Sequence, residues 1–201
     1  MLDRYEMRLS GSGGQGLVLA GLILAEASGI YEGKHVVQTV SYGPAARGGT
    51  SRADVVVSDQ DIDYPKAMGL DILLAMNQMA CDESAGELKP QGLLVVDSHL
   101  VSQVSHLRSV KIPFTRIAKE KCGREQMANI VALGALSKLI PVTPHGAGVV
   151  SLESMESAVM ARIPKGTEKL NKLAFDEGVK AAEEVQKTLV FEEPSEDSDQ
   201  I

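Results

Sequence analysis

Apolar and polar residues alternate along this chain at two spacings, which predicts a succession of strands and helices. Short segments with apolar residues at every second position favour β-strands, and longer segments with apolar residues three and four positions apart favour helices. We expect strands near residues 5–10, 34–40, 52–58, 70–75, 92–97 and 109–113. We expect helices near residues 15–30, 77–86 and 124–140, followed by two C-terminal helices, the last of which begins at about Thr167.

This order of elements predicts an α/β fold with three layers, α/β/α, and a mostly parallel, mixed sheet. Segment 52–58 follows segment 34–40 through a loop without a crossover helix, so one pair of strands is expected to be antiparallel. Segment 124–140 is apolar nearly all round and is expected to be a central helix. A single domain is expected over residues 1–190, and the acidic segment 191–201 is expected to be a disordered tail.

Composition narrows the possible classes of protein. Aromatic residues make up 3% of the chain and tryptophan is absent, so the core must be aliphatic. The formal net charge is −7, without a basic or aromatic cluster, which disfavours nucleic-acid binding. The longest apolar run, Leu17–Ala25, is far shorter than the roughly 18–20 residues that span a bilayer. The isolated cysteines Cys81 and Cys122 imply no disulfide framework, so a cytoplasmic protein without a membrane partner is expected.

A glycine-rich segment, Gly11–Gly16, connects the first predicted strand to the first predicted helix. The N–H groups and positive dipole at the start of that helix favour an anion. The spacing matches the dinucleotide-binding fingerprint, but the second strand ends without the acidic residue that binds the ribose. It also half-matches a P-loop, but Leu17 and Val18 replace the required Lys and Ser/Thr. The alternative is a tight turn that binds no ligand. The candidate anion-binding residues are Gly11, Gly13, Gly14, Gln15 and Gly16.

A second glycine-rich segment, Ser41–Ser51, follows the second predicted strand. Pro44 favours a rigid turn, and the pair Gly48-Gly49 allows the backbone to pass close to a neighbour. Arg47 lies between them, and a guanidinium on such a loop suits a carboxylate, a phosphate or a partner surface. The alternative is that Arg47 forms an ion pair within its own loop.

Three further features give weaker signals. Asn129 lies inside an apolar predicted helix and needs a hydrogen-bond partner, which is either a loop or a ligand. The run Asp97-Ser98-His99 contains the residue types of a catalytic triad, but adjacent residues do not form triad geometry. We interpret it as a strand end that leads to a helix cap. The four histidines lack metal-site spacing, so we predict neither a catalytic residue nor a metal ligand in this chain.

The two glycine segments together resemble those of a known family. The chain has GSGGQG at the start of a helix, then SYGPAARGGTSRADVVVSD, then the proline-bearing segment Ile62–Pro65. With the later segments Asp71–Gln78, Lys89–Asp97 and Asn129–Leu136, this order is similar to the gamma subunit of 2-oxoacid:ferredoxin oxidoreductases. The resemblance covers about Met7 to Ile140.

The resemblance implies a function as part of a larger enzyme. The family's reaction decarboxylates a 2-oxoacid on thiamine diphosphate held through magnesium, passes electrons through iron–sulfur clusters to ferredoxin, and releases an acyl-CoA. Each cluster needs about four cysteines, and the chain has two. By resemblance these groups belong to alpha, beta and ferredoxin-like delta subunits, and the isolated chain is expected to be inactive. The residues expected to contact a partner subunit or CoA are Tyr42, Gly43, Arg47, Gly48, Gly49, Thr50 and Asn129.

An alternative function belongs to a different class. The chain could be a free-standing nucleotide- or flavin-binding α/β protein that uses only the Gly11–Gly16 loop, but that function gives no reason for the loop around Arg47. Within the family, pyruvate, 2-oxoglutarate and branched-chain oxoacids stay open as substrates, with 2-oxoglutarate favoured by overall resemblance. The isolated chain is also expected to expose an apolar patch or to form a homodimer.

Overall fold

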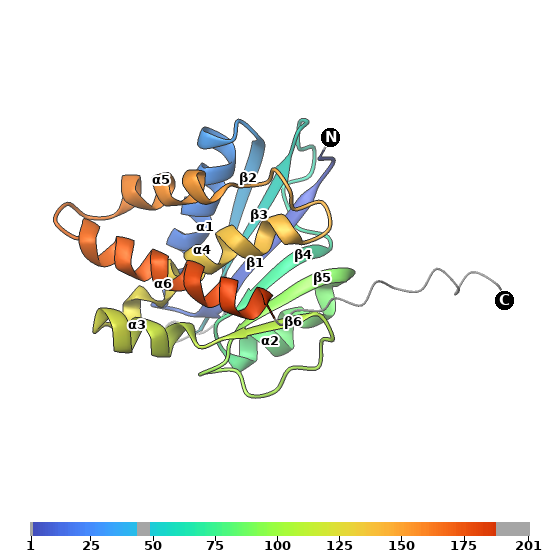
Figure 1. Cartoon of the computed structure of the whole chain (residues 1–201). Helices are drawn as coiled ribbons and strands as arrows, with labels where there is room; N and C mark the ends of the chain where they lie inside the picture. The colour runs from blue at the N-terminus through green and yellow to red at the C-terminus, as the bar shows by residue number, and fades with distance from the viewer. Residues whose placement is uncertain (1, 44–48, 188–201) are drawn as a thin grey trace.

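The computed structural model describes residues 2–43 and 49–187. Its described residues form one six-stranded sheet in the order β2-β3-β1-β4-β5-β6 (Figure 1). Only β3 runs against its neighbours, β1 and β2, while β1, β4, β5 and β6 are parallel. The predicted mixed α/β fold is therefore confirmed. The strands are β1 (Tyr5–Ser12), β2 (His35–Tyr42), β3 (Thr50–Ser58), β4 (Leu70–Ala75), β5 (Leu88–Asp97) and β6 (Ser109–Ile112).

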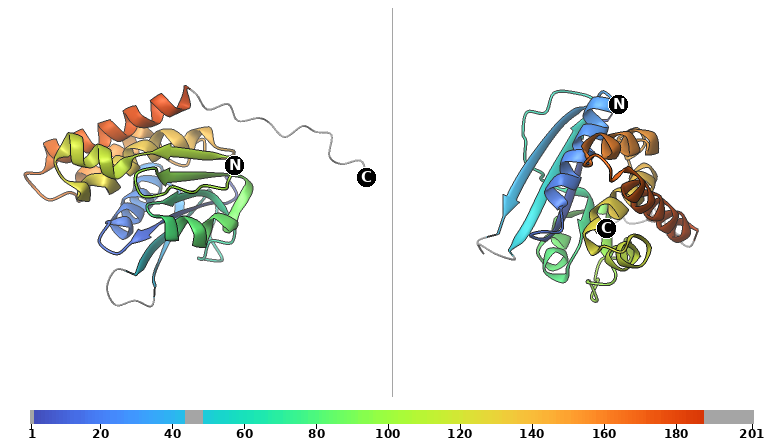
Figure 2. Two further views of the ribbon diagram at one scale, coloured as in Figure 1. Left: turned by 90° about the horizontal axis from the view of Figure 1, so that it is seen from below. Right: turned by 90° about the vertical axis from the view of Figure 1, so that its left-hand side faces the viewer.

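Most helices cover one face of the sheet, and α4 lies between the sheet and α6 (Figure 2). The helices are α1 (Leu17–Glu26), α2 (Gln78–Ser84), α3 (Phe114–Cys122), α4 (Ala128–Leu139), α5 (Leu152–Arg162) and α6 (Glu168–Gln186). Short helical turns are the π-helix η1 (Ala27–Tyr31) and the 3-10 turns η2 (Ala85–Glu87), η3 (Glu125–Met127) and η4 (Ile140–Val142).

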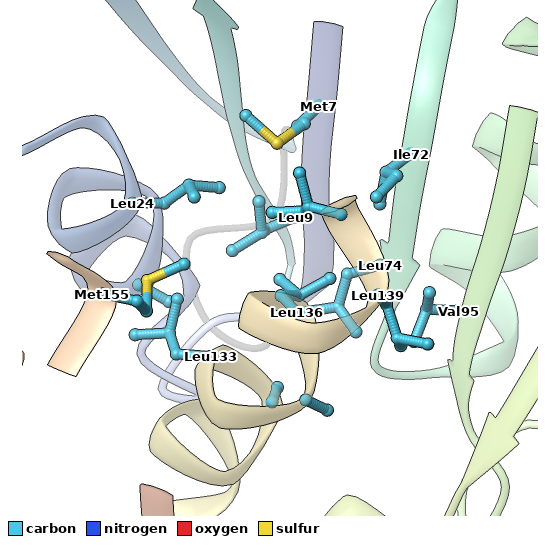
Figure 3. Packing of buried hydrophobic residues seen from close by; sticks show 14 of the residues in the cluster. Met7, Leu9, Leu24, Ile72, Leu74, Val95, Leu133, Leu136, Leu139 and Met155 are labelled. Carbon is cyan, nitrogen blue, oxygen red and sulfur yellow. The ribbon is translucent and has the colours of Figure 1, made fainter. Parts of the chain in front are cut away.

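The main core lies between the sheet and α4. Leu9, Leu74 and Val95 point from three strands toward Leu136 and its neighbours on α4 (Figure 3). Because side chains alternate along a strand, the intervening residues of β4 and β5 face a smaller cluster with α2 on the other side of the sheet. Of the twelve residues of α4, eleven are buried, which agrees with the central position predicted for this segment.

Two glycines allow α4 and α6 to approach closely. A Cβ at Gly134 would lie 2.1 Å from the Phe175 carbonyl oxygen, and one at Gly178 would lie 1.9 Å from that of Val131. The outer helix α6 therefore packs against the backbone of α4. Two layers of helices are thus held on one face of the sheet.

The opposite face contains buried charge. Arg8 on β1 is 1% exposed, and its guanidinium donates to both carboxylate oxygens of Asp54 on β3, at 2.7 and 3.1 Å. It also contacts Glu87 and the Ser84 hydroxyl, where α2 ends. Since Arg8 and Asp54 are directly opposed in the sheet, this ion pair joins β1 to the reversed strand.

Several predicted boundaries need correction. The helix α3 was not predicted, because its residues are largely polar between Pro113 and Gly123. The strand β5 begins at Leu88 rather than near residue 92, with a register shift against β4 between Leu70 and Ile72. The predicted helix 124–140 is divided into the turn η3, the helix α4 and the first residue of η4.

The predicted extent of the domain and the tail stay predictions, since 191–201 lies outside the described residues. Within the described ranges, no helix is long and apolar enough to cross a membrane.

Candidate functional site

The carboxyl ends of the parallel strands meet at one edge of the sheet. The chain leaves β1 through α1 toward β2, and it leaves β4 through α2 toward β5 on the other side. This divergence between adjacent parallel strands is the position at which open α/β sheets usually bind their ligands. The Gly11–Gly16 segment begins in the last two residues of β1 there, Asn77 follows β4, and Asp97 ends β5.

The side chain of Gln15 closes the first glycine loop. Its Oε1 accepts a hydrogen bond from the Ser12 N–H at 2.6 Å, and its Nε2 donates to the Met76 carbonyl at 3.1 Å. Asn77 binds the same loop through Nδ2 to the Ser12 hydroxyl at 2.6 Å, while its Oδ1 caps α2 at the Ala80 N–H. The loop is therefore fastened to the end of β4 by two amide side chains.

Glycine is required at the end of this loop. Gly16 has a φ of 74°, and a Cβ there would lie 2.5 Å from the Asn129 Nδ2. Asn129 is 6% exposed, and its Nδ2 donates to the Gly16 carbonyl at 3.3 Å. We expected the hydrogen-bond partner of Asn129 to be either a loop or a ligand, and the structure shows that it is the loop. Its predicted contact with another subunit or CoA stays a prediction.

The two glycine segments meet at this edge. The Gly13 N–H donates to the Gly49 carbonyl at 2.9 Å, and the Gly43 N–H donates to the Thr50 carbonyl at 2.7 Å. Tyr42 is 72% exposed at the end of β2. Arg47 and Gly48 lie outside the described residues. The structure thus joins Gly13 to Gly49, a contact that the sequence did not predict.

A hollow of about 270 Å³ lies beside the first loop. It is lined by Gly14, Gln15, His99, Leu100, Thr115, Glu125, Gln126 and Ala128. Asp97 lies behind it, fully buried, and accepts hydrogen bonds from the N–H groups of His99 at 3.0 Å and Thr115 at 2.9 Å. Asp97 is a strand end, as we interpreted it, but Ser98 and His99 form a turn rather than a helix cap, and Asp97 instead binds Thr115 in the first turn of α3.

Glu125, which lines this hollow, belongs to an exposed ion pair. Glu125 accepts from Lys119 at 2.8 Å, and this hydrogen bond lowers the pKa of the carboxyl and raises that of the ammonium group. The sequence analysis did not identify Glu125 or Thr115 as site residues. Thr115 comes shortly after the end of β6, whereas Glu125 follows the helix α3, which the sequence did not predict.

Metal and thiol chemistry find little support among the described residues. No group of three or more His, Cys, Asp and Glu side chains in residues 2–43 and 49–187 is arranged to hold a metal ion. Cys81 and Cys122 are free and pack into clusters on opposite faces of the sheet. Burial raises the pKa of both thiols, which disfavours the reactive thiolate.

The fold and its edge define a small α/β domain in which the described parts of the two glycine segments meet at the carboxyl ends of the parallel strands. The chain belongs to the pyruvate ferredoxin/flavodoxin oxidoreductase family, whose model matches residues 6–181. The resemblance to the gamma subunit of these enzymes is thereby confirmed, and the free-standing nucleotide-binding alternative is not favoured.

Individual relatives agree with this assignment. The chain is 47% identical over 186 residues to 2-oxoglutarate synthase subunit KorC of Methanocaldococcus jannaschii, covering 90% of this chain and 96% of the relative. The gamma subunit of keto/oxoacid ferredoxin oxidoreductase from Geobacter sulfurreducens is 45% identical, with a TM-score of 0.79 over 90% of this chain and 97% of that one. The 2-oxoglutarate:ferredoxin oxidoreductase of Magnetococcus marinus, at 23% identity, shares the fold with a TM-score of 0.79, and this chain covers 96% of its own length but 33% of that chain.

Proposed function

We propose that this chain is the gamma subunit of a multi-subunit 2-oxoglutarate:ferredoxin oxidoreductase. The complex would oxidatively decarboxylate 2-oxoglutarate to an acyl-CoA and pass electrons to ferredoxin. The observation that carries the proposal is the 47% identity to a 2-oxoglutarate synthase subunit over nearly the full length of both proteins. In this proposal the complex acts in the cytoplasm, where the two free cysteines stay reduced.

The prosthetic groups of the complex are assigned to other subunits. Thiamine diphosphate with magnesium and the iron–sulfur clusters would belong to alpha, beta and ferredoxin-like delta subunits, and ferredoxin would accept the electrons. Two cysteines are too few for the four-thiolate ligation of a cluster, and Cys81 and Cys122 lie on opposite faces of the sheet. The chain would act by binding its partners and completing their site.

The edge with the two glycine segments is the proposed contact surface. Gly43 and Gly49, on either side of Arg47, are each held by a backbone hydrogen bond, to Thr50 and Gly13. The described residues on both sides of the segment that contains Arg47 are thus held in place, and Tyr42 among them is exposed. We propose that this guanidinium contacts a CoA phosphate or a partner carboxylate.

The Gly11–Gly16 loop has a different proposed role. Its N–H groups at Ser12, Gly13 and Gln15 already donate to acceptors within the chain. These bonds favour a loop that supports the second glycine segment over one that binds an anion. Anion binding by this loop stays a prediction.

Purification through a tag on this chain tests the assignment. We expect alpha, beta and delta subunits to co-elute and the complex to reduce a viologen with 2-oxoglutarate and CoA. The chain expressed alone should be colourless, free of iron and inactive on any 2-oxoacid. Stoichiometric iron in the isolated chain, or failure to recover partner subunits, would contradict the proposal.

Arg47→Lys tests the contact surface. Lysine keeps the charge but loses the bidentate guanidinium, a contact worth about 1.5–3 kcal/mol, so the Michaelis constant for CoA or the dissociation constant of the complex should rise at least tenfold. Arg162→Lys on α5 is the control, because Arg162 binds Glu26 far from this edge. If Arg47→Ala unfolds the free subunit while assembled enzyme keeps full activity, Arg47 is structural.

A further inference from the structure

The two edges of the sheet differ in their protection against strand addition. At one edge, β6 has four residues, includes Lys111, is followed by Pro113 and contacts α6. At the other, β2 pairs with β3 over eight residues without a register shift. Charges, proline and short length are the usual means by which proteins protect an edge strand. The edge at β2 has none of these from Val36 to Tyr42.

The hydrogen-bond pattern shows which backbone groups face outward. The Gly43 N–H donates to Thr50 on β3, in the same register as the rest of the hairpin. Because the direction alternates along an antiparallel strand, the odd-numbered residues of β2 bind β3. The N–H and C=O groups of Val36, Gln38, Val40 and Tyr42 therefore point away from the sheet. No described strand pairs with this side.

The side chains beside this edge are apolar and exposed. Val40 is 41% exposed, Tyr42 is 72% exposed, and Leu19 on the adjacent helix α1 is 42% exposed. Gln38 lies in the same row as Val40 and Tyr42 and donates to the Val18 carbonyl, which places that row on the α1 side. Backbone donors and acceptors and an apolar side-chain surface thus lie together.

We propose that β2 is a strand-addition site that receives an extended segment of another subunit of the oxidoreductase. The inference rests on the proposed function, because it needs a multi-subunit complex. The added strand would have apolar residues at alternate positions facing Val40 and Tyr42, and uncharged residues between them, opposite Thr39 and Ser41. Main-chain hydrogen bonds would supply the affinity, and the alternate side chains the specificity.

We infer that the segment added to β2 comes from another subunit rather than from a second copy of this chain. In the ketoisovalerate oxidoreductase subunit VorA of Methanothermobacter marburgensis, which is 37% identical over 135 residues, the matched part is 28% of a longer chain, so this domain is there joined to other protein of the enzyme. The strand β2 also ends at Tyr42, shortly before the proposed contact residue Arg47 in the sequence. One partner could therefore cover both.

Hydrogen–deuterium exchange on the complex and on the isolated chain tests this surface. We expect the amides of Gln38, Val40 and Tyr42 to exchange freely in the dilute isolated chain and at least tenfold more slowly in the complex. Free exchange of these amides in an assembled, active complex would overturn the inference and leave the proposed function intact. Failure to assemble at all would overturn the proposed function.

Val40→Lys provides an independent test with a matched control. It places a charge on the edge, and because Val40 is half exposed, the isolated chain should keep its Tm within a few degrees. We expect at least tenfold less partner to co-purify. Leu173→Lys on α6, where the leucine is 39% exposed, should leave partner recovery unchanged. Equal recovery with both variants, or amide protection that rises with the concentration of the isolated chain, would overturn the inference in favour of no occupant or of a second copy.

Discussion

The two faces of the sheet differ in the interactions that stabilise them. On the helical face, aliphatic side chains fill the space between the strands and α4, and Gly134 and Gly178 allow a second layer, α6, to pack on the first. On the other face, beside the smaller apolar cluster with α2, a buried arginine, Arg8, binds Asp54 and Glu87. Apolar packing tolerates many arrangements of similar volume, whereas a buried charge requires its partner.

The two faces therefore have different structural roles. Packing against α4 stabilises the sheet as a whole, while the pair Arg8–Asp54 fixes how the reversed strand β3 aligns with β1. A shift of one residue would move Asp54 to the helical face, away from Arg8. Register between β1 and β3 in turn determines that Gly49 meets Gly13 at the site.

The largest expected effect follows from breaking the charged face. Arg8→Met removes the buried bidentate partner of Asp54 and leaves only the more distant Arg52, so the free energy of unfolding should fall by about 3–5 kcal/mol. Denaturant unfolding of the isolated chain measures it. Arg52→Met is the control, because Arg52 is 37% exposed and only 3.5 Å from Asp54, and it should cost less than about 1 kcal/mol. Equal losses of unfolding free energy in the two variants would contradict a special role of the Arg8–Asp54 ion pair in joining β1 to β3.

The helical face is tested at its closest helix contact. Gly178→Ala places a methyl group against the Val131 carbonyl, and the free energy of unfolding should fall by about 2–3 kcal/mol despite the better helix propensity of alanine. Thermal unfolding is the measurement. Gly86→Ala, where no atom lies within 4 Å of the added Cβ, should change stability little. A stabilised Gly178→Ala variant would show that α6 can move away at no cost.

The sequence predicted the helical face better than the charged face. Apolar runs located α1 and α4, and the spacing of apolar residues located α6, because the burial of a helix is directly visible in its sequence. The helix α3 was missed because its buried residues are few, although Pro113 and Gly123, with a φ of 71°, mark its two ends. The role of Arg8 was not predictable, because an arginine within a strand does not reveal its partner on another strand.

At the candidate site, too, the sequence did not predict contacts between distant parts of the chain. Both glycine segments were recognisable from composition and order. The contact between Gly13 and Gly49 depends on β3 returning beside β1, which no local pattern specifies. Likewise the side chain of Gln15 completes the loop through Met76, which lies far along the chain. The sequence therefore predicted the local conformation of the site but not the contacts between residues far apart in the chain.

A smaller effect is expected at the edge between the two faces. Gln15→Ala leaves the Ser12 N–H and the Met76 carbonyl without this partner, so the free energy of unfolding should fall by about 1–2 kcal/mol. Exchange of the Ser12 amide should accelerate in parallel. Gln91→Ala, at an exposed position on β5, is the control. No change in Ser12 exchange would show that the loop holds its shape without Gln15.

The smallest effect concerns a polar contact of the helical layer. Burial opposes ionisation of Glu32, but hydrogen bonds from Ser154 and Ser151 outweigh it and lower the pKa of its carboxyl below the ordinary 4.5. A lowered pKa in the folded state means that this stabilisation is present above the unfolded pKa and is lost as the pH falls through the folded pKa. Glu32→Gln should therefore destabilise the chain modestly at pH 7.

The stability difference between Glu32→Gln and the unsubstituted chain should shrink as the pH is lowered below 4.5. Unfolding curves at pH 7 and in acid measure it. Glu153→Gln, an exposed first-turn residue of α5, provides the comparison. A difference that stays constant with pH would exclude the carboxylate as its cause.

The single reversed strand also constrains the order in which the sheet can form. Tyr42 pairs with Ser51 across a short hairpin, whereas Ser12 must find Thr50 after the whole of α1 and β2 has intervened. Closing the shorter loop costs less chain entropy, so the β2–β3 hairpin can form early and then dock on β1 as a unit. Both glycine segments would then come together in that one docking step, late in folding, and the binding edge would be absent from any intermediate in which only the hairpin is formed.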